Sequence, residues 1–309
     1  MIDLQPDLDL SMAQAEAILE AWLGEPVRCS QTWPLEGAMV NTVLLLEFDR
    51  PPYSAVVKLH GGFDPFALEA KALRFLGSET ECPVPAVYLY DDSRQFVPFA
   101  FLLLEQVPGV CLKKLELEPL VRADIDAQLA QVLAELHGHT RESFGAVDEP
   151  LEARSWSTIF GSRLTEWRAH PEVDRRLAPM VLSTVDAAIG AIPELLRDAG
   201  TPTLVHGDVW DGNLMVQRQD TGRYLLSGLL DPAVQFADVE LELAYLQVFN
   251  NANEAFFSAY NEQRELRPGY EQRRLAYWLH TALVHVALFG DEFFCNFTSQ
   301  TAEALAESA

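Results

Sequence analysis

The spacing of apolar residues predicts a β-rich beginning of the chain. A helix that Ser11 can cap is expected to end near Gly24, because apolar residues recur between them at helical spacing. Two β-rich runs, 40–48 and 54–59, flank a break at Pro51-Pro52 and predict a hairpin.

A second helix and two more strands complete this region. Asp64-Pro65 is a typical helix start, and the apolar stripe that follows it ends at Gly77. Strands are expected near 86–90 and 99–104. The first hundred or so residues therefore predict a small, mostly antiparallel sheet with one inserted helix.

Beyond this region the apolar spacing becomes helical. A β-rich insert at 203–231 interrupts the helices. These patterns predict an α+β protein of two lobes, a β-rich N-lobe at 1–106 and a mainly helical C-lobe at 107–309 that carries the candidate catalytic and metal-binding loops. The expected helices are 119–137, 155–168, 174–198, 239–249, 253–264 and 270–289.

Composition narrows the possible partners. The 309 residues include 46 acidic and 22 basic side chains, a formal net charge of −24. This balance argues against a nucleic-acid partner, which needs clustered Lys and Arg. It suits a cationic or neutral substrate.

The cysteines and the N-terminal residues predict a cytoplasmic location without a membrane partner. The four cysteines are far apart and have no metal-binding spacing, which favours a reducing compartment. The first residues lack the pattern of a signal peptide, and no apolar run is long enough to span a membrane.

One stretch carries most of the chemistry. His206-Gly207-Asp208 follows an apolar run, Asn213 comes five residues after Asp208, and Asp231 ends another apolar run. Phosphoryl transfer from Mg-ATP needs one carboxylate to orient the acceptor hydroxyl, and oxygen ligands to hold the metal. The spacing therefore predicts Asp208 as the catalytic carboxylate, with Asn213 and Asp231 as Mg²⁺ ligands.

Lys58 is the lone lysine on an apolar strand. Its ammonium could hold ATP phosphates, with Glu69 of the next helix keeping it in place. The alternative is a solvated lysine and a surface glutamate; the motif around Asp208 favours the pair.

Two further segments are candidate nucleotide contacts. The turn from Gly37 to Thr42, which includes Asn41, could cradle phosphates through its backbone amides, or it is a plain turn. Backbone groups of Glu105 and Val107 could bind an adenine edge, and the same residues could simply form an interlobe linker.

Two residues beside Asp208 are candidates for the acceptor side. Trp210 either forms a wall of the acceptor site or belongs to the core. Asp211 is either a second acid in the acceptor pocket or a charge of the loop.

These residues resemble small-molecule kinases with a protein-kinase-like fold, the aminoglycoside and choline phosphotransferase group, and within it the fructosamine (ketosamine) kinases. The family's His-Gly-Asp-Leu-Trp-x-Gly-Asn is similar to residues 206–213, with Val209 in place of Leu. Its Asp-Pro-Ala and Glu-x-Asp-Leu-Ala are similar to residues 231–233 and 240–244, with Glu242 in place of Asp. The late helical segments also resemble this family, and the phosphate loop departs from it in lacking a cysteine.

The resemblance implies a protein-kinase-like fold and ATP-dependent phosphorylation of a sugar hydroxyl, the 3-hydroxyl in that family, on a free or protein-bound ketosamine. By matching position, Lys58, Glu69, Asp208, Asn213 and Asp231 take the nucleotide, metal and catalytic roles. Trp210 takes the family's acceptor-side position.

Two other functions stay open from the sequence. The same fold could phosphorylate another hydroxyl, that of an aminoglycoside or a choline-like alcohol. The chain could also be a nucleotide-binding pseudokinase, although the presence of Lys58, Asp208, Asn213 and Asp231 argues against this.

Overall fold

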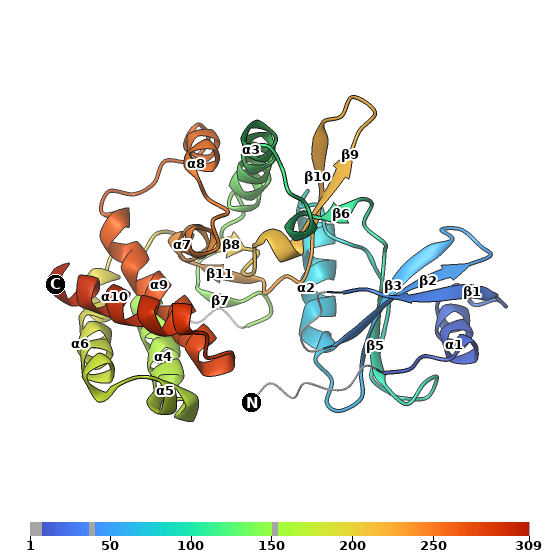
Figure 1. Ribbon diagram of the computed structural model, residues 1–309, viewed down its shortest axis with the longest axis horizontal. Coiled ribbons are helices and arrows are strands. Elements are labelled where there is room, and N and C mark those ends of the chain that lie inside the picture. Colours follow the sequence, from blue (N-terminus) through green and yellow to red (C-terminus); the bar gives the residue numbers. More distant parts are fainter. Residues whose placement is uncertain (1–7, 37–40, 150–153, 309) are drawn as a thin grey trace. The chain divides into compact units, whose positions relative to one another are not determined.

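The computed structural model describes residues 8–36, 41–149 and 154–308. Contacts divide the chain into two compact units. One combines Met1–Leu115 with Gly212–Pro232, and the other combines Glu116–Asp211 with Ala233–Ala309. We call them the sheet unit and the helical unit (Figure 1). The expected α+β class, with a β-rich beginning and a mainly helical remainder, is confirmed.

The sheet unit takes in more of the chain than residues 1–106. Strand β6 (Val110–Cys111) pairs with β9 (Leu214–Arg218), and β9 pairs with β10 (Tyr224–Leu229). The amide of Leu229 also donates to the carbonyl of Pro83 at 2.7 Å. These backbone bonds join the later part of the β-rich insert, from Gly212 onward, to the sheet unit, although the sequence pattern places the whole insert with the helices.

A five-stranded antiparallel sheet forms the centre of the sheet unit, with strand order β1-β2-β3-β5-β4. The expected hairpin around Pro51-Pro52 is present, because β2 pairs with β3. The elements are α1 (Met12–Leu23), β1 (Cys29–Pro34), β2 (Thr42–Phe48), β3 (Ser54–His60), α2 (Phe66–Glu79), β4 (Val87–Asp91), β5 (Ala100–Leu104) and the short helix η1 (Leu112–Lys114).

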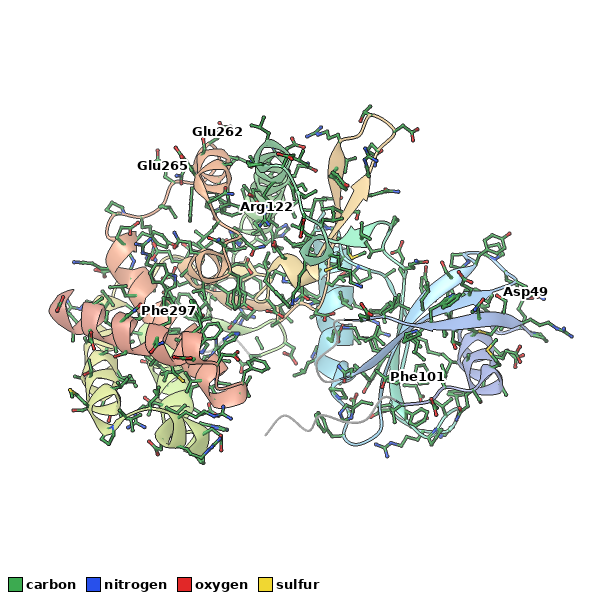
Figure 2. The ribbon with its side chains drawn as sticks, viewed as in Figure 1. Asp49, Phe101, Arg122, Glu262, Glu265 and Phe297 are labelled. Carbon is green, nitrogen blue, oxygen red and sulfur yellow. The ribbon has the colours of Figure 1, made fainter. Side chains whose placement is uncertain are left out.

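Helices α1 and α2 cover opposite faces of this sheet (Figure 1). Successive side chains of a strand point to opposite faces. On β5, Phe101 and Leu103 therefore pack on the α1 side, while Leu102 and Leu104 pack on the α2 side. Figure 2 labels Phe101 within this packing. The same alternation of side chains determines which face of the sheet each side chain of β3 points to.

Local differences from the sequence pattern have simple causes. Strand β1 was not expected, because only one of its six residues is buried and it lacks an apolar face. Helix α2 continues past Gly77 to Glu79, because Gly77 does not adopt the left-handed conformation with which a glycine ends a helix. Asp64 still supports the helix start, accepting a 2.9 Å hydrogen bond from the amide of Phe66.

Most helices of the helical unit, though not α3 and α8, contribute to a large apolar cluster that includes Trp156, Phe160 and Tyr277. Phe297 of α10, labelled in Figure 2, packs against this cluster. A three-stranded sheet, ordered β7-β11-β8, lies in the same unit. The elements are α3 (Pro119–Leu136), β7 (Gly145–Ala146), α4 (Trp156–Arg168), α5 (Pro171–Arg176), α6 (Pro179–Leu195), β8 (Thr203–Val205), β11 (Gln235–Ala237), α7 (Glu240–Val248), α8 (Glu254–Asn261), α9 (Tyr270–Leu288) and α10 (Glu292–Ser308).

The helical unit differs from the expectation in two places. The single helix expected at 174–198 is divided into α5 and α6, because Pro179 holds Ala178 in an extended conformation before α6. Helix α10 was not expected at all. Within the described residues, no helix combines the length and the apolar character needed to cross a membrane.

Candidate functional site

Lys58 lies on the face of the sheet that α2 covers. Its neighbours Val57 and Leu59 belong to the core on the α1 side, while its cross-strand partner Leu102 packs with α2. The alternation of β3 therefore aims Lys58 toward α2. Its side chain is only 9% exposed, so the ammonium needs charged partners.

Two carboxylates supply those partners. Nζ of Lys58 lies 2.6 Å from Oε1 of Glu69, the partner expected from the sequence, and it also forms an ion pair with Asp231. Burial would lower the pKa of Lys58, but Asp231 and Glu69 outweigh this effect and the pKa is raised. Lys58 is therefore a fixed positive charge at neutral pH.

Asp231 and Asn213 come together where β10 ends and β9 begins. The amide of Leu230 donates to the carbonyl of Asn213 at 2.8 Å. Asp231 follows with a φ of 54°, a left-handed conformation that Asp tolerates better than most residues. Asn213 is buried on the short helix η2 (Asp211–Asn213), whereas the Asp231 side chain is 49% exposed.

The donor set at this turn fits magnesium. Asp231 offers carboxylate oxygens and Asn213 an amide oxygen, which are hard ligands. Mg²⁺ usually takes one or two protein oxygens and completes its shell with substrate phosphates and water. Two such residues in the unit that also holds Lys58 suit a metal that arrives with a nucleotide.

The segment after β5 has backbone groups available for a ligand. The amide of Glu105 donates to Ala86, and its carboxylate accepts from the Ala86 amide at 3.1 Å. Among the described residues, the carbonyl of Glu105 and the amide of Val107 have no backbone partner. The structure thus leaves the adenine-edge interpretation of these two residues open.

The other predicted nucleotide contacts lie before β2. Oδ1 of Asn41 is buried and has no hydrogen-bond partner within the described residues. Gly37, predicted to help cradle phosphates, lies outside the described residues.

Asp208 is carried by a turn that follows β8 in the helical unit. Gly207 has a φ of 90°, and a Cβ at this position would overlap the carbonyl oxygen of Ala233. The amide of Ala233 donates to the carbonyl of His206 at 2.8 Å, so the two backbones lie side by side. Only glycine fits such a close approach at this φ.

Glu242 of α7 holds the same turn from within the core. Its carboxylate accepts the amides of His206 at 3.2 Å and Gly207 at 2.6 Å. His137 lies 2.8 Å from the same carboxylate and 2.7 Å from the hydroxyl of Tyr260. Burial would raise the pKa of Glu242, but the hydrogen bond and charge of His137, with smaller contributions from His206 and Gly207, lower it overall.

Three aromatic side chains, Tyr245, Phe249 and Trp210, lie beside the turn that carries Asp208. The hydroxyl of Tyr245 donates to Oδ1 of Asp208. Burial, and then the charge of Asp208, raise the pKa of Tyr245, so the hydroxyl keeps its proton. Ring centroids of Tyr245 and Phe249 are 4.7 Å apart, and those of Trp210 and Phe249 are 6.2 Å apart. Trp210 is thus part of an aromatic wall that includes a partner of Asp208.

Asp211 is bound by two other elements of the helical unit. Nη1 of Arg122, on α3 (Figure 2), lies 2.8 Å from one oxygen, and Nδ2 of Asn251 donates to the other at 2.6 Å. Arg122 also pairs with Asp126, one turn further along α3. These bonds hold the loop after Asp208 against α3.

The sequence did not predict the roles of Tyr245, Glu242 and His137. Glu242 was noticed only as a departure from a family motif, and a carboxylate within an apolar helix is the signal that could have identified it. Tyr245 and His137 gave no such signal, because each lies on a helix among apolar residues where an aromatic side chain is ordinary core.

Comparisons with known proteins agree with this arrangement. A profile of the family described as fructosamine kinase matches residues 11–307. A protein from Vibrio vulnificus assigned as a ketoamine kinase is 24% identical over 269 residues, which cover 84% of this chain and 87% of the relative.

Solved structures extend the likeness to the whole fold. A candidate fructosamine-3-kinase from Thermobifida fusca is 25% identical, with a TM-score of 0.75, over 97% of this chain and 100% of that one. A thermostable mutant of an aminoglycoside phosphotransferase, solved with ADP and hygromycin B, is 18% identical with a TM-score of 0.66, over 96% of this chain and 99% of that one. The expected kinase-like fold is confirmed.

Proposed function

This chain belongs to the fructosamine kinase family and is an ATP-dependent ketosamine kinase, and we propose that Asp208 is the catalytic carboxylate of this reaction. The acceptor is a sugar hydroxyl, the 3-hydroxyl by family resemblance. The observation that best supports the ATP-dependent reaction is the charge cluster of Lys58, Glu69 and Asp231, which brings together a strand, a helix and the turn that carries a candidate Mg²⁺ ligand within one unit.

Lys58 would bind phosphate oxygens of ATP. Its raised pKa keeps the ammonium charged, and Glu69 keeps its direction. In the structure Lys58 also pairs with Asp231. Because both carboxylates compete for one ammonium, a bound nucleotide and its cation would replace part of this pairing with phosphate contacts.

Asn213 and Asp231 would hold Mg²⁺ through their side-chain oxygens. The metal, when bound with ATP, neutralises charge that develops on the transferred phosphoryl group. The protein contributes the geometry: the hydrogen bond between Leu230 and Asn213 fixes the two ligand-bearing turns against each other. The segment of Glu105 and Val107 would bind the adenine edge through backbone groups.

Asp208 would orient the acceptor hydroxyl and receive its proton late in the transfer, because the transition state is loose and needs little help from a strong base. Tyr245 donates to Oδ1 of this carboxylate and would thereby hold its orientation toward the acceptor. Trp210 would form the apolar wall on which a sugar ring can stack. Asp211 would position the loop through Arg122 and Asn251 rather than touch the acceptor.

A screen of acceptors tests this function. ATP consumption is measured with fructosyl-lysine, ribulosyl-lysine and an aminoglycoside, and phosphorus NMR of the product locates the phosphorylated hydroxyl. We expect turnover with a ketosamine and a phosphate on its 3-hydroxyl. Turnover with the aminoglycoside alone would overturn the assignment in favour of another acceptor class.

A further inference from the structure

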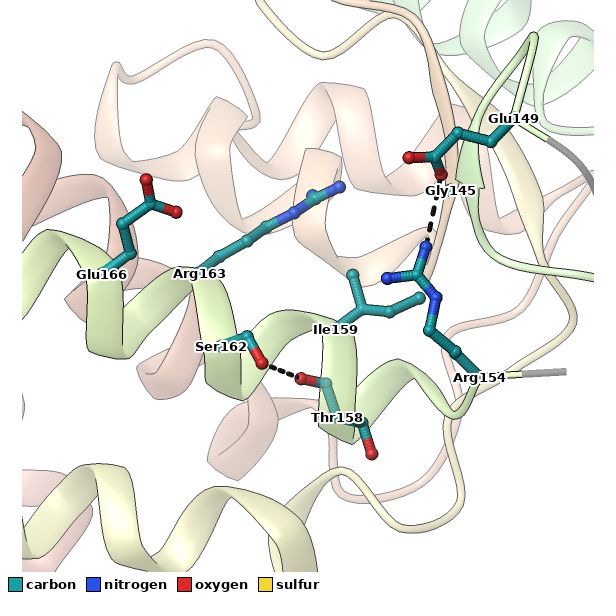
Figure 3. Close-up of a pocket in the computed structure, with 8 residues that line it drawn as sticks. All are labelled: Gly145, Glu149, Arg154, Thr158, Ile159, Ser162, Arg163 and Glu166. Atoms are coloured by element: carbon teal, nitrogen blue, oxygen red, sulfur yellow. Dashed lines mark hydrogen bonds and ion pairs between the residues drawn. The ribbon is translucent and has the colours of Figure 1, made fainter. Parts of the chain in front are cut away.

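A cavity of about 210 Å³ lies in the helical unit, where Gly145 of β7, Glu149 and Arg154 face helix α4. At roughly 30 Å³ for each water molecule, it has room for about seven waters or a small organic group. Figure 3 shows its lining, which includes Glu149, Arg154, Thr158, Ser162, Arg163 and Glu166.

Charged groups converge in this cavity. The guanidinium groups of Arg154 and Arg163 and the carboxylate of Glu149 point toward one another (Figure 3). Arg154 lies 3.6 Å from Glu149, whose carboxylate also accepts the amide of Ala146 at 3.0 Å. Glu166 lies further along α4, at the other end of the lining (Figure 3).

A third arginine borders the same place. Nη2 of Arg141 would lie 3.4 Å from a Cβ added to Gly145, and Gly145 lines the cavity beside Glu149. This Nη2 is buried and has no hydrogen-bond partner among the described residues. Of the residues that the structure describes, three arginines and one glutamate, Glu149, therefore lie at this end of the cavity.

Within the described residues, Arg163 and Arg141 donate hydrogen bonds to neutral acceptors, and Glu149 is a nearby negative charge for both. Arg163 donates to the side-chain oxygen of Gln235 at 2.6 Å, and Arg141 donates to the carbonyl of Ser143, also at 2.6 Å. Burial lowers the pKa of both guanidinium groups. Buried charges are normally paired, and this chain has 46 acidic residues for 22 basic ones. Where the described guanidinium groups gather around Glu149 they outnumber the carboxylates, and this end of the cavity is suited to an anionic ligand.

The pocket is tied to the strand that runs beside the catalytic turn. Gln235, the partner of Arg163, lies opposite Val205 in the pairing of β11 with β8. Two residues earlier on the same segment, Ala233 donates to His206. Val205 and His206 lead directly into Asp208, so the pocket and the catalytic carboxylate are connected by short backbone pairings inside one unit.

We propose that this pocket binds the carboxylate of a small ligand through Arg163 and Arg154. A guanidinium presents paired N–H donors that match the two oxygens of a carboxylate. In the kinase reaction this carboxylate belongs to the amino-acid part of the acceptor, a statement that rests on the proposed function. The other source of the same chemistry is a free carboxylate, which the test distinguishes.

Binding is measured first, without catalysis. The parent is titrated with sodium acetate at constant ionic strength while NMR follows the arginine side-chain Nε–H signals. We expect the Nε–H chemical shifts of Arg163 and Arg154 to change and reach saturation. The affinity for acetate should be at least tenfold weaker in Arg163→Gln. It should also be reduced in Arg154→Gln, a half-exposed position that tolerates change. The matched control is Arg168→Gln on the same helix, an arginine already paired with Asp174 and Asp186. If the shifts of the parent do not saturate, or if Arg163→Gln binds acetate as tightly as the parent does, the proposed carboxylate site is wrong.

Kinetics then identify the source of the carboxylate. Fructosyl-glycine is compared with fructosyl-methylamine, which lacks the carboxylate. We expect Arg163→Gln to raise KM about tenfold for fructosyl-glycine alone, with kcat unchanged. If acetate binds but Arg163→Gln affects both acceptors equally, the acceptor assignment is wrong and the ligand is a free carboxylate. If acetate binds and the parent phosphorylates neither acceptor, the proposed function fails while the pocket stands.

Discussion

The hydroxyl of Tyr245 donates a hydrogen bond to Oδ1 of Asp208, the carboxylate that we propose orients the acceptor. Tyr245 lies on α7, which also carries Glu242, and Glu242 accepts two backbone amides of the turn before Asp208. One helix thus holds both the backbone and the side chain of the catalytic turn. A rotation of Asp208 would break the bond with Tyr245, and a shift of its backbone would break the bonds with Glu242.

Tyr245→Phe should lower kcat without unfolding the protein. The change removes one hydrogen bond to a charged acceptor, worth about 1.5 kcal/mol, or roughly a tenfold loss of rate if it is fully expressed in the transition state. The affinity for ATP should stay the same. Steady-state kinetics measure both quantities, with Tyr53→Phe at an exposed turn as the control. An unchanged kcat would show that Asp208 does not depend on Tyr245.

Asp208→Asn should abolish phosphoryl transfer and preserve nucleotide binding. The amide has nearly the same shape but cannot accept the hydroxyl proton, and the nucleotide contacts proposed here belong to other residues. Transfer is measured by ATP consumption and binding by calorimetry. Asp198→Asn, in the loop before β8, is the matched control. Transfer at the parental rate by Asp208→Asn would refute the catalytic role.

Asp231→Asn should weaken the binding of Mg-ATP. Asn tolerates the left-handed backbone that Asp231 adopts, so the turn is preserved while the charge is lost. We expect a loss of at least tenfold in metal-dependent nucleotide affinity, measured by calorimetry at several Mg²⁺ concentrations. Asp220→Asn, in the exposed turn between β9 and β10, should change nothing. An unaltered Mg²⁺ dependence in Asp231→Asn would count against its role as a ligand.

Gly207→Ala should destabilise the protein and remove most of its activity. A left-handed conformation costs a non-glycine residue about 1–2 kcal/mol, and the added methyl group would in addition overlap the Ala233 carbonyl. Thermal unfolding and ATP consumption are the measurements. Gly190→Ala is the control, because Gly190 lies inside α6 with nothing near its missing Cβ. That change should stabilise the protein by roughly 0.5–1 kcal/mol. Equal effects of the two substitutions would contradict the close approach at Gly207.

Glu242→Gln should lower stability at neutral pH and change its dependence on acid. The pKa of Glu242 is lowered in the folded protein, whereas an unfolded Glu titrates near about 4.3. The ionised form therefore stabilises the fold above about pH 4.3, and this contribution is lost as the pH falls through the folded pKa. Disrupting one partner of a buried charged network typically costs about 3 kcal/mol.

Melting temperatures of the parent and Glu242→Gln between pH 7 and pH 4 test this prediction. The difference should be largest at pH 7 and should narrow below about pH 4.3. Glu254→Gln, at the exposed start of α8, serves as the control. A difference that is constant with pH would mean that the charge of Glu242 does not support the turn.

Much of the fold could be predicted from apolar spacing. The hairpin of β2 and β3, the helices α3, α4 and α9, and the α+β class all follow from local periodicity. The elements that were missed lack such signals: β1 has no apolar face, and β6, β7 and β11 span only two or three residues each. Their existence depends on pairing with distant segments, which periodicity does not record.

The sequence likewise predicted one part of the candidate site and not the other. The residue types and spacing of Asp208, Asn213 and Asp231, together with Lys58 on its strand, indicated phosphoryl transfer from the sequence by itself, because that chemistry requires those groups in a short motif. The pairing of Lys58 with Glu69 was predicted, since a buried ammonium needs an acid nearby. The second partner of Lys58 is Asp231, which lies 173 positions further along the chain, so the sequence pattern does not reveal this pairing.

Only the tertiary structure decided which side chains hold the catalytic turn and which arginines lie together around Glu149. Tyr245 donates to Asp208, Glu242 accepts the amides of the turn before it, and His137 contacts Glu242. Nothing in the local sequence of these residues indicates these contacts, which depend on the packing of distant segments. The arginine pocket likewise depends on β7, β11 and α4 meeting in space. Local sequence determines element type and the chemistry of a motif, whereas burial and the pairing of charges are properties of contacts between distant segments.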